Sequence, residues 1–493
     1  MDARPRISRL VALALPLLLG GCAVGPDYVP PEVTLSPKWS DDGVPAARPD
    51  RLATLGEWWK GFGDPLLDRL IEEAVAGNLD VAAAKAKVRE ARANRREAIG
   101  GLLPQVDGSG SAERVKTAGA GGTVSSQFQA GLDAAWELDL FGANARAVEA
   151  ATRGVEAAED DLHATLLTLV GDVATNYAEA RGLQARIELA RRTAQSQRRT
   201  AELTRTRFQA GSVSAVDGAK ADALAASTEA TIPELRSSYA QAVHRLSVLT
   251  GREPGALAAL MVTPKPIPAP RRALPTGIPA DVLHLRPDVR AAERRLAQAT
   301  ATIGKAEAAL YPSVSLTGQL STTGVRLGDL GRASSIAWSW GPSISVPIFH
   351  GGRLVAARDA AEAERDQSLA AWKSSVLTAL EDVENALVGL AQERIKGRKL
   401  AEATARYRQA AELSRTLYAS GSSSFLDVLD AERSLYSVED SLLRSRVAVA
   451  IDHVALAKAL GGGWSRPIGS AKTQTADSTP RPRSTEAEAA AGE

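Results

Sequence analysis

The chain has 493 residues, a net charge of +1, 44% hydrophobic residues and 24% charged residues. This composition is typical of a globular protein and excludes a disordered chain, and the balanced charge gives no basic surface for nucleic acid. The single cysteine excludes an internal disulfide, and the scattered five histidines and two methionines predict no metal site.

Residues 1–21 have the pattern of a signal peptide, with three arginines before the apolar run Leu10–Leu19. That run is too short to span a bilayer as a helix. The next residues end in Cys22 and, as Leu-Gly-Gly-Cys, resemble the bacterial lipoprotein box. The resemblance implies cleavage before Cys22 and a covalent lipid on it, and Ala23 favours sorting to the outer membrane. The alternative is an ordinary signal peptide followed by an unrelated cysteine.

Residues 22–63 are rich in proline, glycine and tryptophan and show no sustained period. We therefore expect an extended segment that leads away from the anchor. Asp64-Pro65 then opens a helix, because proline is tolerated in the first helical turn. A break is expected near Gly77-Asn78, after which helix continues from about Asp80 to Gly100.

Residues 127–140 alternate strictly between apolar and polar side chains, which predicts a strand with two different faces. The apolar face comprises Phe128, Ala130, Leu132, Ala134, Trp136, Leu138 and Leu140, and the polar face Gln127, Gln129, Asp133, Glu137 and Asp139. Residues 336–348 repeat the apolar face with Ile336, Trp338, Trp340, Ile344, Val346 and Ile348. A soluble sandwich would show the same alternation. Four long strands in a lipoprotein favour membrane strands with lipid outside and water inside.

From about Ala147 to Gln209 the chain reads as one continuous helix, roughly 95 Å long. Apolar residues recur there every seven positions, which indicates coiled-coil packing, at Val148, Val155, Leu162 and Leu169. A partner helix is expected over about Ser214–Thr250. The matching pair later in the chain is expected over about Arg353–Ala419 and Ser424–Leu460, with the same repeat at Leu369, Val376, Val383 and Leu390.

The chain thus contains two copies of one unit, over residues 64–250 and 288–461. Pro104 matches Pro312 and Phe141 matches Phe349 at an offset of 208 residues, while the ends of the long helices match at an offset of 210. A proline-rich connector, 251–287, separates the units and is expected to be extended. The three glycines 461–463 read as a helix stop and flexible exit, and the polar tail 462–493 is expected to be disordered.

Each unit ends its long helix in the same tight turn, which we call the tip. A glycine suited to a left-handed backbone ends the helix, and a serine with an aspartate three residues later begins the next one. These residues are Gly211, Ser214 and Asp217 in the first tip and Gly421, Ser424 and Asp427 in the second. The aspartates are interpreted as helix caps.

Four strands cannot close a barrel, and open strand edges in lipid leave backbone groups unpaired at a cost of several kcal/mol each. The chain is therefore expected to assemble with further copies. Two copies would supply eight strands around a filled interior, and three would supply twelve strands around a lumen. Composition does not choose between them.

Several stretches resemble the outer-membrane efflux factors of the TolC type: DPLLDRLIEEAVAGN at 64–78, WELDLFG at 136–142, LRPDVRAAERRLAQA at 285–299, ALYPSVSLTG at 309–318, and both tips. The lipoprotein box with GPDYVPP at 25–31 is similar to their lipoprotein branch, which serves resistance-nodulation-division pumps. The resemblance covers nearly all of the mature chain. It implies a mainly α fold with membrane β strands, in which a homotrimer forms a twelve-strand outer-membrane barrel and a twelve-helix periplasmic tunnel.

The resemblance also implies a passive exit duct rather than an enzyme. It would export drugs or other small toxic compounds that an inner-membrane pump delivers through a periplasmic adaptor. Two alternatives remain: an exit duct for type I protein secretion, and a coiled-coil lipoprotein tether without a pore. No arrangement of nucleophile, base and oxyanion hole can be recognised in the sequence.

Leu426, Asp430 and Arg433 lie on one helix face just after the second tip. By resemblance to the family's LxxxDxxR pattern, they would face the lumen and form its narrowest ring. The first unit has Lys220 at the position of Asp430, which makes Lys220 a candidate partner for that carboxylate. The alternative is a solvated face with a local Asp430–Arg433 pair. Four tip residues would dock the adaptor: Gly211, Ser214, Gly421 and Ser424.

Overall fold

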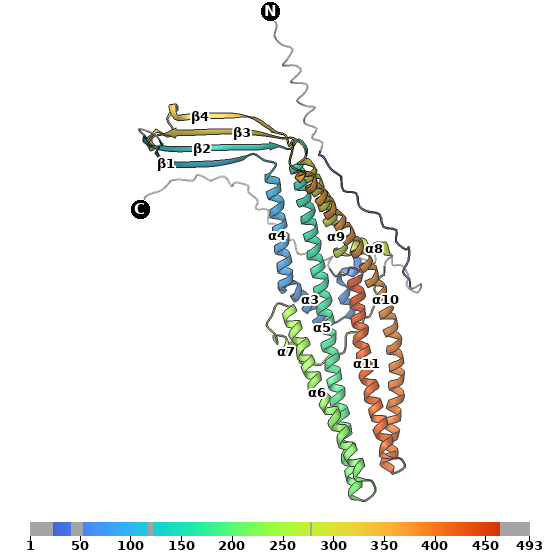
Figure 1. Ribbon diagram of the computed structural model, residues 1–493. Helices are drawn as coiled ribbons and strands as arrows, with labels where there is room; N and C mark the ends of the chain where they lie inside the picture. The colour runs from blue at the N-terminus through green and yellow to red at the C-terminus, as the bar shows by residue number, and fades with distance from the viewer. Residues whose placement is uncertain (1–22, 41–52, 117, 119–121, 277–278, 464–493) are drawn as a thin grey trace, which may run out of the picture.

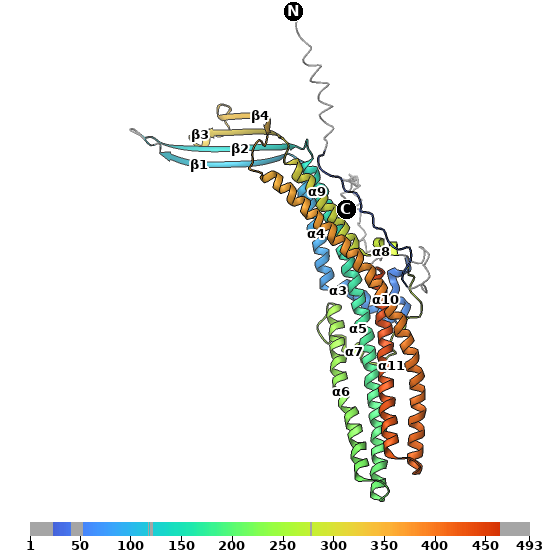
Figure 2. The same ribbon diagram turned by 45° about the vertical axis from the view of Figure 1, so that its right-hand side comes forward.

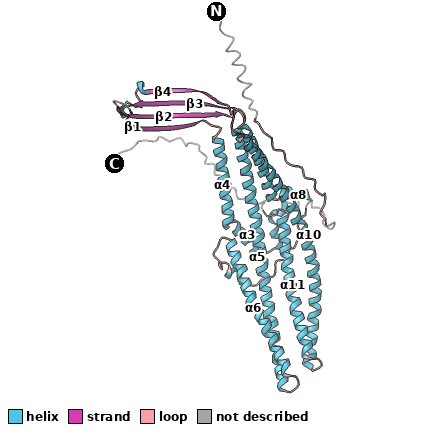
Figure 3. Ribbon diagram, in the orientation of Figure 1, coloured by secondary structure: helices cyan, strands magenta, loops and turns pink. Residues whose placement is uncertain are grey.

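The computed structural model describes residues 23–40, 53–116, 118, 122–276 and 279–463. The molecule is elongated, with a sheet at one end that lies across the axis of a bundle of long helices (Figure 1). Strands are confined to that end and helices make up the rest (Figure 3). The predicted signal peptide, Cys22 and the tail from residue 464 lie outside the described residues.

From α4 in the first unit and α9 in the second, the two units have the same order of elements, as the sequence predicts. The first contains α3 (Pro65–Gly77), α4 (Leu79–Gly100), β1 (Gln105–Lys116), β2 (Val124–Leu138), α5 (Ala143–Gln209) and α6 (Ala215–Leu249). The second contains α9 (Pro287–Ala308), β3 (Ser313–Gly324), β4 (Ile336–Ser345), α10 (Arg353–Ser420) and α11 (Phe425–Ala459). The short helices η2 (Leu327–Asp329) and η3 (Ala333–Ser335) join β3 to β4.

The strands form one antiparallel sheet in the order β1-β2-β3-β4. Leu132 lies opposite Leu320, and Leu320 lies opposite Trp338 on the next strand. Asp107 lies opposite Asp133. Because side chains alternate across a strand, this register gathers the apolar positions of the strands on one face and the polar positions on the other. The predicted strands and their two faces are confirmed.

The strand prediction is wrong at its end, because β2 stops at Leu138. The Asp139 carboxylate, assigned above to the polar strand face, instead accepts hydrogen bonds from the backbone N–H groups of Asn144 and Ala145, at 3.0 and 2.6 Å. An acidic side chain there satisfies donors that the first turn of a helix leaves unpaired. Asp139 therefore fixes the start of α5 directly below the sheet.

The long helices α5 and α10 have 67 and 68 residues, which makes each about 100 Å long. α5 packs against α4 near the sheet and against α6 toward the tip, and α10 packs in the same way against α9 and α11 (Figure 1). Contacts of α5 with α9 and α11 join the units. The predicted heptad positions contribute buried side chains, namely Val155, Leu162, Leu169, Val376, Val383 and Leu390.

The shorter helices of each unit meet end to end at a glycine. Gly251 follows α6 with φ of 72°, and a Cβ there would lie 2.1 Å from the carbonyl oxygen of Gly77. Gly461 follows α11 with φ of 78°, and a Cβ there would lie 2.7 Å from the carbonyl oxygen of Leu285. Both positions combine a left-handed backbone with a contact too close for any side chain. The duplication therefore extends to this junction.

Two segments predicted to be extended contain short helices. Within 22–63 lies η1 (Ala53–Phe62), because Trp58 and Phe62, four residues apart, both reach the buried core. The connector 251–287 contains α7 (Ala258–Met261) and α8 (Pro279–Leu285). The rule that excludes proline from helices does not apply in the first turn, where Pro279 lies.

The glycines after α11 also differ from expectation. Gly461 does end the helix, but all three glycines are buried, so they do not form a flexible exit. A Cβ at Gly462 would lie 2.9 Å from the carbonyl oxygen of Leu55, and a Cβ at Gly463 would lie 3.2 Å from Nε1 of Trp58. The glycines allow this segment to pack against η1. Gly462 and Gly463, assigned above to the tail, therefore belong to the packed fold, and the rest of the predicted tail lies outside the described residues.

The main core lies where the shorter helices meet and includes Leu70, Tyr177, Leu246 and Val454. Residues 23–40 run outside it along the helices, from the sheet end toward the middle of the bundle (Figure 1). The buried Arg146 side chain holds this extended segment by donating to the carboxylate of Asp27, at 2.8 Å. None of the helices in the described ranges is both long and apolar enough to cross a membrane.

Candidate functional site

The two tips lie side by side at the end of the molecule opposite the sheet (Figure 2). Gly211 has φ of 76° and Gly421 has φ of 82°, so both adopt the predicted left-handed backbone. No atom lies within 4 Å of a Cβ built on either glycine. The requirement for glycine is therefore one of backbone conformation, and the surrounding surface is open.

The capping boxes are confirmed in both tips. The side chain of Ser214 accepts from the backbone N–H of Asp217, and that of Ser424 accepts from the backbone N–H of Asp427. The carboxylates bond back to the serine N–H groups, at 3.2 and 3.1 Å. Hydrogen bonds from Ser423 and Ser424 lower the pKa of Asp427 below its ordinary value. The tip aspartates thus act as helix caps.

The predicted aperture residues lie together on an exposed face of α11. Leu426 is 54% exposed, and Asp430 and Arg433 are also exposed. Among the described residues, neither a hydrogen bond nor an ion pair joins Asp430 to Arg433 or to Lys220, which is exposed on α6. The local pair and the Lys220 pair are therefore not formed within one chain. The role of this face in a lumen stays a prediction.

The opposite face of α11 holds a buried carboxylate that the sequence analysis missed. Glu432 is 2% exposed, and it accepts from Nε of Arg415 at 2.8 Å and from the Thr200 hydroxyl at 3.3 Å. It thereby ties α11 to both long helices. The duplication offered a signal, because Arg205 and Asp222 form the matching ion pair in the first unit.

An aromatic cluster fastens the two hairpins of one chain near their tips. The hydroxyl of Tyr418 donates to the Thr204 hydroxyl at 3.1 Å, and the Arg207 guanidinium lies 4.7 Å from the Tyr418 ring centroid. Arg207 also donates to the carbonyl oxygen of Ala419. Phe425 packs on Tyr418 with Val428 and Leu429 in the same buried cluster. The hairpins are thus held together at a seam inside the chain.

The described residues contain no group of three or more His, Cys, Asp or Glu side chains that could hold a metal ion. The chemistry at the tips is therefore that of capped helix ends, exposed apolar side chains and a few unpaired charges.

Comparisons with known proteins show which family has this sequence and fold. A family model described as "Outer membrane efflux protein" matches residues 70–252 and 278–462. Nodulation protein T of Rhizobium leguminosarum bv. trifolii is 37% identical over 93% of this chain and 98% of its own length. The solvent efflux pump outer membrane protein SrpC of Pseudomonas putida is 35% identical over 91% and 97%. The solved outer-membrane channel OprN superposes with a TM-score of 0.82 at 36% identity, over 90% of this chain and 100% of that one.

Proposed function

The chain belongs to the outer membrane efflux protein family, and on that premise we propose that three copies of it form one exit duct. The protein is an outer-membrane efflux channel component with a long periplasmic extension, and it is not an enzyme. Its partners are those of an efflux system, a periplasmic adaptor and an inner-membrane pump. We assign the pump to the resistance-nodulation-division class.

The main support is the two-faced sheet with unpaired edges. Trp338 and Trp340 on β4 are 70% and 74% exposed on the apolar face, as expected for side chains that face lipid. β1 and β4 each have a neighbour on one side only. Edges of this kind are tolerated in a membrane only when further strands pair with them. A coiled-coil tether has no need of such a sheet.

The duplication predicts how neighbouring copies join. Within the chain, β2 of the first unit pairs with β3 of the second, with Leu132 opposite Leu320. Shifting each partner by 208 residues places Trp340 of one copy opposite Ala112 of the next, again on the apolar face. The β1–β2 and β3–β4 pairings, which the duplication relates, differ in register by two residues. The register predicted between copies therefore holds to within two residues. Repetition closes a barrel, and twelve strands leave the lumen that an efflux duct needs.

We place a covalent lipid on Cys22. Ala23, the next residue along the chain, packs against Gly142 at the start of α5, directly below the sheet. A Cβ built on Gly142 would lie 2.7 Å from the Ala23 Cβ. An acyl chain on the preceding residue would therefore enter the membrane beside the sheet. This supports a lipid partner in the outer membrane in addition to the barrel itself.

We assign the aperture to Leu426, Asp430 and Arg433, with Lys220 as the cation that a neighbouring copy contributes. The exposed face of α11 supports this, because the three side chains point away from the chain's own core. The adaptor docks on the tips at Gly211, Ser214, Gly421 and Ser424, where the surface is open. The cargo class is small toxic organic compounds.

Accumulation of a fluorescent hydrophobic dye in intact cells tests the function. Deleting the gene should raise accumulation, and the wild-type gene should restore the low level. A charge-bearing variant at both tip glycines should fail to restore it while reaching the outer membrane. Equal accumulation with and without the gene, in cells where the adaptor and pump are active, would contradict an efflux role. No feature of the described residues favours protein secretion over this function.

A further inference from the structure

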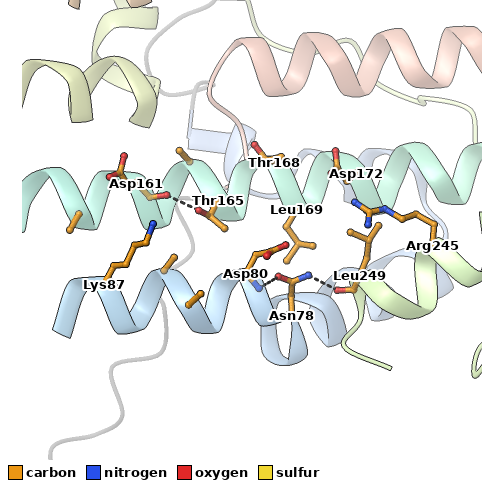
Figure 4. Close-up of a pocket in the computed structure, with 14 residues that line it drawn as sticks. Asn78, Asp80, Lys87, Asp161, Thr165, Thr168, Leu169, Asp172, Arg245 and Leu249 are labelled. Atoms are coloured by element: carbon orange, nitrogen blue, oxygen red, sulfur yellow. Dashed lines mark hydrogen bonds between the residues drawn. The ribbon is translucent and has the colours of Figure 1, made fainter. Parts of the chain in front are cut away.

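A groove of about 680 Å³ lies between α4, α5 and α6, where the shorter helices of the first unit meet (Figure 4). Charged side chains line it, namely Asp80, Lys87, Asp161, Asp172 and Arg245. Asp161 pairs with Arg295 at 2.5 Å. The other four make no ion pair within the described residues, although they face one groove.

The same place in the second unit has a complete ion cluster. Arg286 pairs with Asp288 at 2.6 Å and with Asp382 at 2.8 Å, and these carboxylates match Asp80 and Asp172 by the offsets of the duplication. In the first unit Asn78 replaces the arginine. The cations of the first-unit groove are Lys87 on α4 and Arg245 on α6.

Asn78 keeps only one of the contacts that Arg286 makes. Its Nδ2 donates to the carbonyl oxygen of Leu249 at 3.0 Å, and Arg286 donates to the matching carbonyl of Ala459 at 3.4 Å. The end-to-end junction of the helices is thus preserved in both units. The direct ion pairs are not, because the amide of Asn78 carries no charge to pair with the two carboxylates.

The second-unit junction is closed by α5. Leu167 of α5 lines it and is 8% exposed. Gly171 lies one helical turn after Leu167, and a Cβ there would lie 3.5 Å from Cδ of Lys458 and 3.8 Å from Val454. Position 171 of the long helix therefore faces positions 454 and 458 of the shorter helix. We call the same pairing, shifted by the offset between the units, the duplication rule.

Among the described residues, no helix covers the first-unit junction in this way. The helix that matches α5 is α10, with Leu377 at the position of Leu167 and Glu381 at that of Gly171. Leu377 is 67% exposed on its edge of the molecule. On the other edge, Leu79 is 75% exposed and Val248 is 46% exposed, at the positions of Pro287 and Lys458. Large exposed apolar side chains thus occur on both surfaces that the duplication rule would join.

We propose that α10 of a neighbouring copy closes this groove, with its Leu377 packed on Leu79 and Val248 and its Glu381 paired with Arg245. Position 381 faces positions 244 and 248 by the rule above, and Arg245 lies between them and projects into the groove (Figure 4). The neighbour thus supplies a carboxylate to the arginine and an apolar cover to the groove. The inference rests on the proposed trimer but concerns one joint within it.

A cysteine pair tests the geometry in the full-length, membrane-extracted protein. Val248→Cys with Glu381→Cys should form disulfides between chains, seen as dimers and trimers on non-reducing gels, because at the matching positions within the chain a Cβ on Gly171 lies 3.5 Å from the Lys458 side chain. Val248→Cys with Val388→Cys is the matched control, because Val388 is also exposed but lies about 10 Å further along α10. The control should stay monomeric on the same gel. Each single-cysteine variant, run on the same gel, shows how much dimer arises from a disulfide with the native Cys22.

A charge reversal tests the ion pair. Arg245→Glu and Glu381→Arg should each lower the temperature at which the oligomer dissociates in detergent, and the double variant should recover most of the loss. Additive losses in the double variant would overturn the pairing. If the protein forms conducting trimers but the 248–381 pair never cross-links, the groove assignment is wrong and the exit duct stands. If the wild-type protein forms no oligomer, the proposed function itself fails.

Discussion

His453 lies on α11 inside the main core, with ring centroids of Trp58 and Phe62 at 6.4 and 5.4 Å. Burial and the charge of Arg394 lower its pKa from 6.5 to about 4. Its Nδ1 has no hydrogen-bond partner among the described residues. The imidazole is therefore held neutral in the folded protein, while the unfolded chain binds a proton at a higher pH.

This difference predicts a pH-dependent stability. Because the folded pKa is the lower one, the contribution of His453 is complete above about pH 6.5 and is lost as the pH falls toward 4, by about 3 kcal/mol in total. His453→Phe should flatten the fall in Tm between pH 7 and pH 4.5, measured by calorimetry in detergent. A variant whose Tm falls as steeply as that of the wild type would assign the acid sensitivity to other groups.

Cys22 carries the second residue-scale prediction. Cys22→Ser should abolish incorporation of labelled palmitate and slow processing of the precursor, because the serine hydroxyl does not take the place of the thiol. The barrel is expected to insert still, since its apolar face is itself a membrane anchor. Labelling of the serine variant at the wild-type level would show that the lipid is attached elsewhere.

At the scale of elements, the tips should depend on backbone conformation and on an open surface. Gly211→Asp or Gly421→Asp introduces a side chain at a positive φ and a charge at the docking surface, which we expect to cost about 1 kcal/mol locally. Cross-linking to the adaptor should weaken and drug sensitivity should rise, while the oligomer stays intact. Gly100→Asp is a control, because Gly100 lies in α4 near the sheet, far from the tips, with open space around it. Unchanged cross-linking in both tip variants would remove the docking assignment.

The elements that sequence predicted well are those fixed by neighbours along the chain. Gly211 and Ser214 act within four residues, and the strand faces follow from a period of two. Pairs between elements were missed, as with Arg415 and Glu432, because such contacts depend on how each helix is rotated about its axis. The helix at Pro279 was missed because proline was treated as a breaker where it is only a helix start.

At the scale of the whole molecule, the duplication suits the chain to the ring that we propose. In that ring, the contacts between its two units would recur between copies, but with different residues. Phe425, Val428 and Leu429 pack the seam inside the chain, whereas their first-unit counterparts are Ala215, Gly218 and Ala219. In the proposed trimer, the seam between copies would therefore be packed less tightly near the tips. Opening should separate copies there rather than split a chain.

The aperture prediction follows from this assembly. Threefold symmetry brings three Asp430 carboxylates close together, and like charges repel unless a cation such as Arg433 or Lys220 lies between them. Such contacts contribute about 0.2–1 kcal/mol each where water reaches them. Asp430→Ala with Arg433→Ala should raise single-channel conductance and admit large antibiotics, with little change in oligomer stability. A double variant with wild-type conductance would place the constriction elsewhere.

The most direct measurement is the conductance of the purified, full-length protein in a planar bilayer, together with its mass in detergent. Three copies that enclose a lumen predict a mass of three chains and discrete conductance steps, larger in the Asp430→Ala, Arg433→Ala variant. A protein of single-chain mass, or a trimer that inserts without any conductance in either form, would contradict the exit duct and favour a tether.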